Sequence, residues 1–151
     1  MDIINPEQFF RDFPRLNKAI KPTSPHTKKY NCISWAVGVD DRPWWPGAKP
    51  DMYWPPGFPE ESTLSVFKAT FASLGYELCD DGNIESGYEK IVLYAKGNEP
   101  THAARQLKDG RWWSKCGKNV DIVHNLEELE GPCYGNVAMF FRRPLLHKGG
   151  N

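Results

Sequence analysis

Several features that would indicate a function class at once are missing from this sequence. Lysine plus arginine and aspartate plus glutamate are equal at 19 each, so no net field would attract nucleic acid or an anionic membrane. No apolar run approaches the roughly 20 residues that cross a bilayer. Residues 1–6 have neither the basic stretch nor the apolar core of a secretory signal. We therefore expect a cytoplasmic protein that binds neither nucleic acid nor a membrane.

Cysteine spacings that bind metals are missing too. The chain has four cysteines, Cys32, Cys79, Cys116 and Cys133, and none of them forms a Cys-x-x-Cys pair. The sequence therefore indicates no structural zinc site, and it implies no other metal or cofactor. In a cytoplasmic protein the cysteines are expected to be free thiols. Apart from Cys32, we interpret them as core-filling residues.

Three helices are expected before the first strand. Asn5, followed by proline, is a cap and first-turn signal for a short helix. Asn31 caps a compact helix that begins at Cys32. Ser62 or Thr63 opens the clearest helix, because apolar residues then recur at helical spacing.

Strand-like segments dominate the rest of the chain. An Asp-Gly pair at residues 109–110 predicts a hairpin. The expected strands, with a brief helix at 126–130 among them, are residues 76–79, 89–95, 101–107, 111–115 and 136–142. Helices followed by a meander of strands favour an α+β fold, with N-terminal helices packed on an antiparallel sheet. We expect a single domain over residues 1–151, with an ordered core from about 29 to 144.

One segment carries most of the unusual composition. Residues 40–61 contain six prolines and three tryptophans, so they can form neither a helix nor a central strand. Such a loop would be a lid packed on the core, one wall of a substrate groove next to Cys32, or a surface for a partner protein. The candidate substrate-binding residues are Trp35, Trp44, Trp45 and Trp54.

A thiol site is the sharpest chemical hypothesis. Cys32 follows a helix cap, where free N–H donors would stabilise a thiolate and then an oxyanion. His102, at the beginning of an expected strand, is the candidate base. The third member that orients the imidazole is Ser114 if it lies on the partner strand of the hairpin. Asp121, in the loop beyond, is the alternative with the better chemistry, because a carboxylate stabilises an imidazolium.

An inert interpretation of the same residues stays open. Cys32 is then a small buried packing residue, since free cysteine is among the most buried residue types. His102 is a surface residue at a strand edge, and His124 is a packing or capping residue. Arg105 and Arg111 are expected to face each other across the hairpin on a solvent surface.

Two segments of the sequence carry a resemblance. Residues 30–36 (Tyr-Asn-Cys-Ile-Ser-Trp-Ala) and 101–115 (from Thr-His-Ala-Ala-Arg to Arg-Trp-Trp-Ser-Lys) look like those of a family of uncharacterised, mostly bacterial domains. The likeness extends through 53–57 and 82–91, and so covers most of residues 29–142. That family has no settled function to carry over.

A more distant resemblance is to the papain-like superfamily, including the NlpC-type cell-wall peptidases. In this sequence, as in that superfamily, a cysteine opens a helix and a histidine follows on a strand. The likeness implies Cys32 as nucleophile, His102 as base and Ser114 as third member. Serine departs from the histidine, asparagine or aspartate that is usual at the third position.

These observations lead to one functional prediction and one alternative. The prediction is a thiol hydrolase or acyltransferase that acts on an amide or ester bond of a peptide-like or small-molecule substrate through Cys32 and His102. The alternative is a non-catalytic, immunity-type module that binds a partner protein through the loop at residues 40–61.

Overall fold

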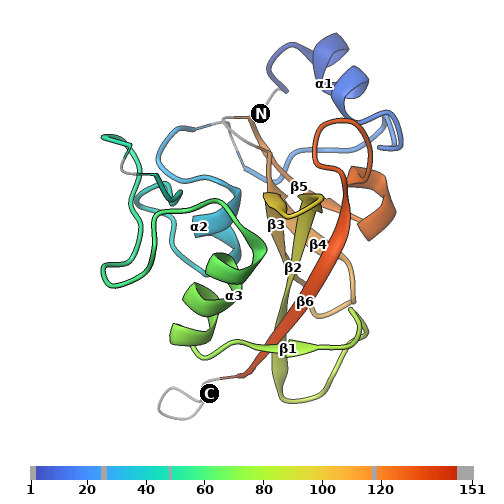
Figure 1. Ribbon diagram of the computed structural model, residues 1–151. Coiled ribbons are helices and arrows are strands. Elements are labelled where there is room, and N and C mark those ends of the chain that lie inside the picture. Colours follow the sequence, from blue (N-terminus) through green and yellow to red (C-terminus); the bar gives the residue numbers. More distant parts are fainter. Residues whose placement is uncertain (1–2, 25–26, 48, 117–118, 146–151) are drawn as a thin grey trace.

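The computed structural model of this α+β protein describes residues 3–24, 27–47, 49–116 and 119–145 (Figure 1). Six antiparallel strands form one sheet in the order β1-β6-β2-β3-β4-β5. They are β1 (Glu77–Cys79), β2 (Tyr88–Lys96), β3 (Glu99–Gln106), β4 (Trp112–Lys115), β5 (Asp121–His124) and β6 (Asn136–Pro144). The helices are α1 (Pro6–Asp12), α2 (Cys32–Ala36), α3 (Leu64–Ser73) and the 3-10 turn η1 (Leu126–Leu129).

The caps predicted for the three helices are confirmed. The side chains of Asn5, Asn31 and Thr63 each accept a hydrogen bond from the backbone N–H three residues further on. At α2 the cap is reciprocal, because the Ser34 hydroxyl also accepts from the Asn31 N–H at 2.9 Å. Both ends of this first turn are therefore satisfied, which holds a helix of only five residues in place.

The sheet agrees with the predicted strands except at β5. Asp121 lies in this strand and not in a loop, because residues 121–124 pair with β4 over its whole length. The predicted hairpin joins β3 to β4, with Gly110 at φ +93° in its turn. Across this hairpin the partner of Arg105 is Trp113, so the expected opposition of Arg105 and Arg111 is wrong.

Apolar side chains cover both faces of the sheet. Along β2, Leu93 belongs to the cluster under α2 and α3, and the next residue, Tyr94, to the cluster that includes the α1 segment. This alternation follows from the pleat of a strand. Figure 1 shows α2 and α3 on one side of the sheet and α1 near its end. We call the two sides the α2 face and the α1 face.

The proline- and tryptophan-rich segment packs down on the α2 face. Trp44 and Trp54 are only 5% and 8% exposed. Trp45 and Trp54 lie against Phe67 of α3, with ring centroids 5.5 and 5.1 Å apart. Apart from a bridge between Trp44 and Tyr53, the described part of residues 40–61 has no strand and no helix.

Two further expectations concern the whole chain. All four cysteines are free thiols, as predicted. Within the described ranges, no helix has the length and apolar character to cross a membrane.

Candidate functional site

The first turn of α2 lies where two strands of the sheet separate. β3 and β4 pair at Arg105–Trp113 and Gln106–Trp112, and the pairing does not continue toward residues 102 and 115. α2 contacts both strands. The helix that carries Cys32 therefore stands over the two strands that carry His102 and Ser114.

Backbone N–H groups act on the sulfur of Cys32. The N–H groups of Ala103, Ile33 and Cys32 itself act on the thiol and favour its ionised form, as does the charge of Lys115. Burial acts in the opposite direction and is the larger effect, since Cys32 is only 7% exposed. It raises the pKa of the thiol to about 11. The thiolate expected from the helix cap is thus not the resting form of this site.

This raised pKa predicts how Cys32 reacts with iodoacetamide. Only the thiolate is alkylated, and a raised pKa makes the thiolate rarer at neutral pH. The rate constant at Cys32 should therefore climb about tenfold per pH unit above neutrality, and level off only near pH 11. Peptide mapping of protein labelled at several pH values measures this profile. A plateau near neutral pH would instead show a preformed ion pair, and urea-unfolded protein provides the reference rate.

His102 is completely buried on the α1 face. Its ring stacks on Tyr134, with centroids 4.0 Å apart and planes 8° apart. Its Nε2 lies 2.9 Å from the Ser114 Oγ, whereas its Nδ1 is buried and has no hydrogen-bond partner among the described residues. Burial, together with the neighbouring His124, lowers the pKa of His102 well below its ordinary value. The imidazole is therefore neutral at rest.

A chain of hydrogen bonds determines which ring nitrogen of His102 carries the proton. The His124 Nδ1 lies 2.9 Å from the Asn125 carbonyl oxygen, which can only accept. Burial lowers the pKa of His124 to about 4, so its ring is neutral and its Nε2 must accept. The Ser114 hydroxyl, 2.6 Å away, donates to that Nε2, and its oxygen accepts from the His102 Nε2–H. The lone pair of His102 is thus left on Nδ1.

Asp121, the alternative candidate for orienting the His102 imidazole, lies on the opposite face of the sheet from that ring. It pairs with Lys115 across β4 and β5, one residue out of step with Ser114, so its side chain points to the α2 face. There its Oδ2 accepts from the Tyr30 hydroxyl at 2.7 Å. The side chain that hydrogen-bonds His102 is Ser114.

Cys32 and His102 lie on two elements in contact, α2 and β3, but are not hydrogen-bonded to each other within the described ranges. Cys32 packs in the cluster of the α2 face together with Ala103. The ring of His102 points to the other face, against Tyr134. The sulfur nevertheless lies beside the backbone N–H that directly follows His102.

A cavity of about 580 Å³ opens beside Cys32. It is lined by Lys28, Tyr30, Asn31, Cys32, Pro43, Asp51 and Met52. The loop at residues 40–61 thus contributes one wall, and it does so through Pro43, Asp51 and Met52. The four tryptophans considered as substrate-binding residues do not line this cavity; Trp35, Trp44 and Trp54 are buried in the core.

Residues 21–142 match a domain family described as a domain of unknown function, DUF7689. The chain belongs to this family. No curated protein and no solved structure matches it. The matched range of the DUF7689 domain contains Cys32, His102, Ser114 and His124, but the family description assigns them no chemistry.

Sequence reasoning interpreted His124 as a packing or capping residue. The signal that would have placed it at the site is its spacing. Residues 122 and 124 lie on the same face of β5, and this face meets Ser114 and Trp112 on β4. This spacing is informative only when residues 121–124 are known to form a strand, and the sequence pattern alone did not indicate that strand. In the part of the chain that the structure describes, no cluster of side chains suited to a metal ion occurs.

Proposed function

We propose that this DUF7689 protein is a cysteine hydrolase or acyltransferase with a papain-like arrangement, in which Cys32 attacks the carbonyl carbon of an amide or ester. The observation that carries the proposal is the buried Nδ1 of His102, which has no hydrogen-bond partner among the described residues. A buried polar atom without a partner is costly, so it calls for an explanation, and a catalytic role is one such explanation. Here the atom is the basic Nδ1 of His102, and the backbone N–H of the next residue, Ala103, acts on the Cys32 thiol.

The chemistry proceeds in two halves. In the proposed mechanism the Cys32 sulfur and the His102 Nδ1 meet through the gap where β3 and β4 separate. There the Cys32 proton moves to the His102 Nδ1 as the sulfur forms a bond to the carbonyl carbon, and the carbonyl oxygen becomes an oxyanion. The oxyanion collapses, the carbon–nitrogen or carbon–oxygen bond breaks, and the imidazolium returns the proton to the leaving amine or alcohol. Water then attacks the thioester, giving one proton to His102. The carbon–sulfur bond breaks, and the thiol is restored by that proton.

Both partners are neutral at rest, because burial disfavours each ion alone. The proton transfer therefore accompanies the attack, and His102 acts as a general base. In the proposed mechanism the N–H groups of Cys32 and Ile33, which act on the thiol at rest, donate to the oxyanion. Ser114 keeps the proton of His102 on Nε2, so that Nδ1 stays available.

The cavity beside Cys32 indicates the substrate class. Its volume, about 580 Å³, suits a small molecule or a short peptide-like segment. Tyr30, Pro43 and Met52 give it apolar surface, and Lys28 and Asp51 place one charge of each sign at its lining. The non-catalytic alternative, a module that docks a partner through exposed tryptophans, has less support because Trp44 and Trp54 are buried.

Trapping the acyl-enzyme tests this function. The protein is incubated with a panel of short and medium-chain p-nitrophenyl esters and thioesters, and its intact mass is measured. We expect one acyl group on Cys32, located by peptide mapping and removed by hydroxylamine. Cys32→Ala should lose this adduct, and Cys133→Ala, which removes a half-buried thiol elsewhere, should keep it.

The distribution of label decides the result. Acylation spread over the half-buried thiols of Cys79 and Cys133, or persisting unchanged in Cys32→Ala, would contradict the proposal. Selective acylation of Cys32 would distinguish an assembled site from ordinary thiol reactivity, since its raised pKa disfavours uncatalysed attack.

A further inference from the structure

Arg105 occupies an unusual position on the α2 face. Its guanidinium carbon lies 3.9 Å from the ring centroid of Trp35 and 4.7 Å from that of Trp113. The two indoles meet edge to face, with centroids 4.6 Å apart and planes 88° apart. The guanidinium therefore sits in a corner formed by two perpendicular rings, which restricts its rotamers in advance of any ligand.

The N–H donors of Arg105 have no acceptor in the part of the chain that the structure describes. Within the described ranges, no carboxylate lies within ion-pair distance of Arg105. Three other arginines of the sheet and its hairpin differ in this respect. Arg111 is paired with Asp109, Arg142 with Glu77 and Glu85, and Arg143 with Glu89. No Arg105 nitrogen is among the fully buried unsatisfied atoms, so the free donors have access to solvent.

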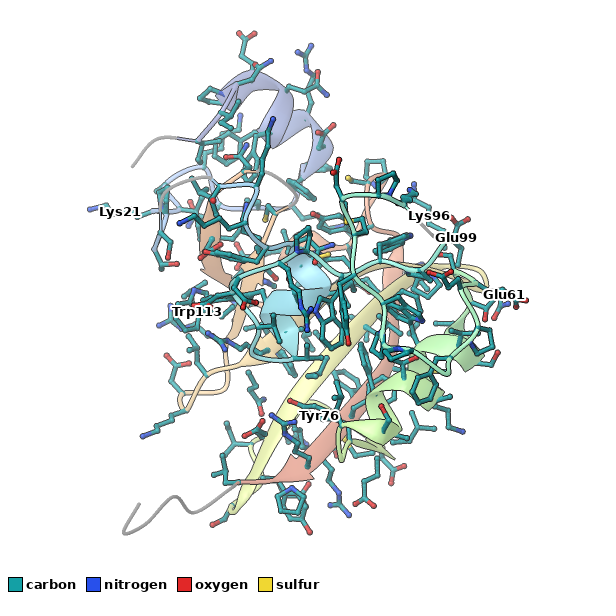
Figure 2. The ribbon with its side chains drawn as sticks, turned by 90° about the vertical axis from the view of Figure 1, so that its left-hand side faces the viewer. Lys21, Glu61, Tyr76, Lys96, Glu99 and Trp113 are labelled. Carbon is teal, nitrogen blue, oxygen red and sulfur yellow. The ribbon has the colours of Figure 1, made fainter. Side chains whose placement is uncertain are left out.

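These donors border a second cavity, of about 250 Å³, at the C-terminal end of α2. Figure 2 shows this side of the molecule, with Trp113 and Tyr76 labelled. The charged residues that line the cavity are Glu89, Lys90, Arg105, Lys108 and Arg143. Cys32 lines the separate cavity at the opposite end of the helix.

Two of the four cations are already compensated. Glu89 accepts from the Arg143 Nε at 2.7 Å and from the Tyr76 hydroxyl at 3.1 Å. Lys90 lies 3.3 Å from an Asp81 carboxylate oxygen and 3.4 Å from one of Glu85.

Arg105 and Lys108 are the two cations left over, since neither has a carboxylate at ion-pair distance within the described ranges. They are the two cations of the lining that a ligand anion could pair with directly, although the charges of Asp121, Glu89 and Asp40 also act on Arg105 from further away.

We propose that this cavity binds the phosphoryl group of a small ligand, held by the Arg105 guanidinium and the Lys108 ammonium. A phosphate monoester carries a charge of about −1.5 to −2 at pH 7, which matches two free cations, whereas a carboxylate would leave one of them unbalanced. A planar guanidinium held by stacking binds two phosphate oxygens at once. The site is distinct from the proposed acyl-transfer site and does not depend on it.

A titration with inorganic phosphate tests the proposal. Two-dimensional ¹H–¹⁵N spectra of the whole protein are recorded at constant ionic strength, with chloride replaced stepwise by phosphate. We expect saturable shifts at the Trp35 and Trp113 indole N–H groups and along residues 105–108. Arg105→Gln and Lys108→Gln should each weaken binding at least tenfold. Arg111→Gln, in the same hairpin but already paired, should change it less than twofold.

Each outcome decides the matter. Chemical shifts that grow linearly with phosphate, without saturation, would overturn the site, and so would equal phosphate affinity in wild type and Lys108→Gln. Lys108 is exposed, so its replacement leaves the fold intact even if Arg105→Gln does not fold. Acetate binding as tightly as phosphate would overturn the assignment to a phosphoryl group. Loss of phosphate binding in Lys108→Gln, with the rate of Cys32 acylation unchanged, would confirm that the two sites are separate.

Discussion

His102→Gln should lower the rate of Cys32 acylation by about 100- to 10,000-fold, which is the range that a positioned general base contributes. The glutamine side chain can still donate to Ser114, so the hydrogen-bond chain to His124 retains its first link. What it removes is the lone pair on the buried Nδ1. Release of p-nitrophenol from the ester that labels Cys32 most efficiently, followed at a single turnover, measures the loss.

His124→Gln is the matched control for this experiment. The substituted amide can still accept from the Ser114 hydroxyl, but it cannot take up a proton. Because His124 only orients Ser114 through Nε2, its replacement should cost less than tenfold and leave the shape of the pH–rate profile unchanged. Equal losses in the two variants would mean that both histidines are structural. An unchanged rate in His102→Gln would remove His102 from the reaction.

The local signals in the sequence were sufficient for the helices and for most of the sheet. Asn31 specifies the start of α2 because its side chain and the Ser34 hydroxyl satisfy each other's backbone, and that chemistry is contained in four consecutive residues. The hairpin at Gly110 is specified in the same way by its turn. Neither prediction needed any knowledge of residues far away in the chain.

The features that were missed depend on distant partners. β5 is four residues long, and it becomes a strand because β4 pairs with it along its length. The position of Asp121 follows from that pairing, since a strand alternates its side chains between two faces. Arg105 contacts Trp35, which lies on a helix seventy residues earlier, so its stacked position has no local signal.

The charge state of Cys32 was predicted wrongly for a different reason. The helix cap and its N–H groups were read correctly from Asn31, and they do favour the thiolate. Their effect is smaller than that of burial, which depends on how β3, β4 and the loop enclose the sulfur. Depth is a property of the whole packed chain, and a sequence pattern does not contain it.

Phe67→Ala should destabilise the protein by about 3–5 kcal/mol, the usual cost of deleting a buried aromatic ring. Phe67 is completely buried on α3, and its ring contacts those of Trp45, Trp54 and Phe71. Urea unfolding followed by circular dichroism measures the change. Ile84→Ala, at a side chain 53% exposed, is the control and should stay within about 0.5 kcal/mol of wild type.

This substitution also tests how the cavity beside Cys32 is built. Pro43, Asp51 and Met52 form its wall, and their loop is attached to α3 through the two tryptophans on Phe67. Removing the ring should therefore speed amide hydrogen exchange within the described part of residues 40–61 more than in β2, which keeps its pairing with β3 and β6. It should also raise the rate of Cys32 alkylation, because a looser wall admits water and lowers the desolvation that protects the thiol. A destabilised variant with unchanged loop exchange and unchanged alkylation would show that α3 does not hold the wall.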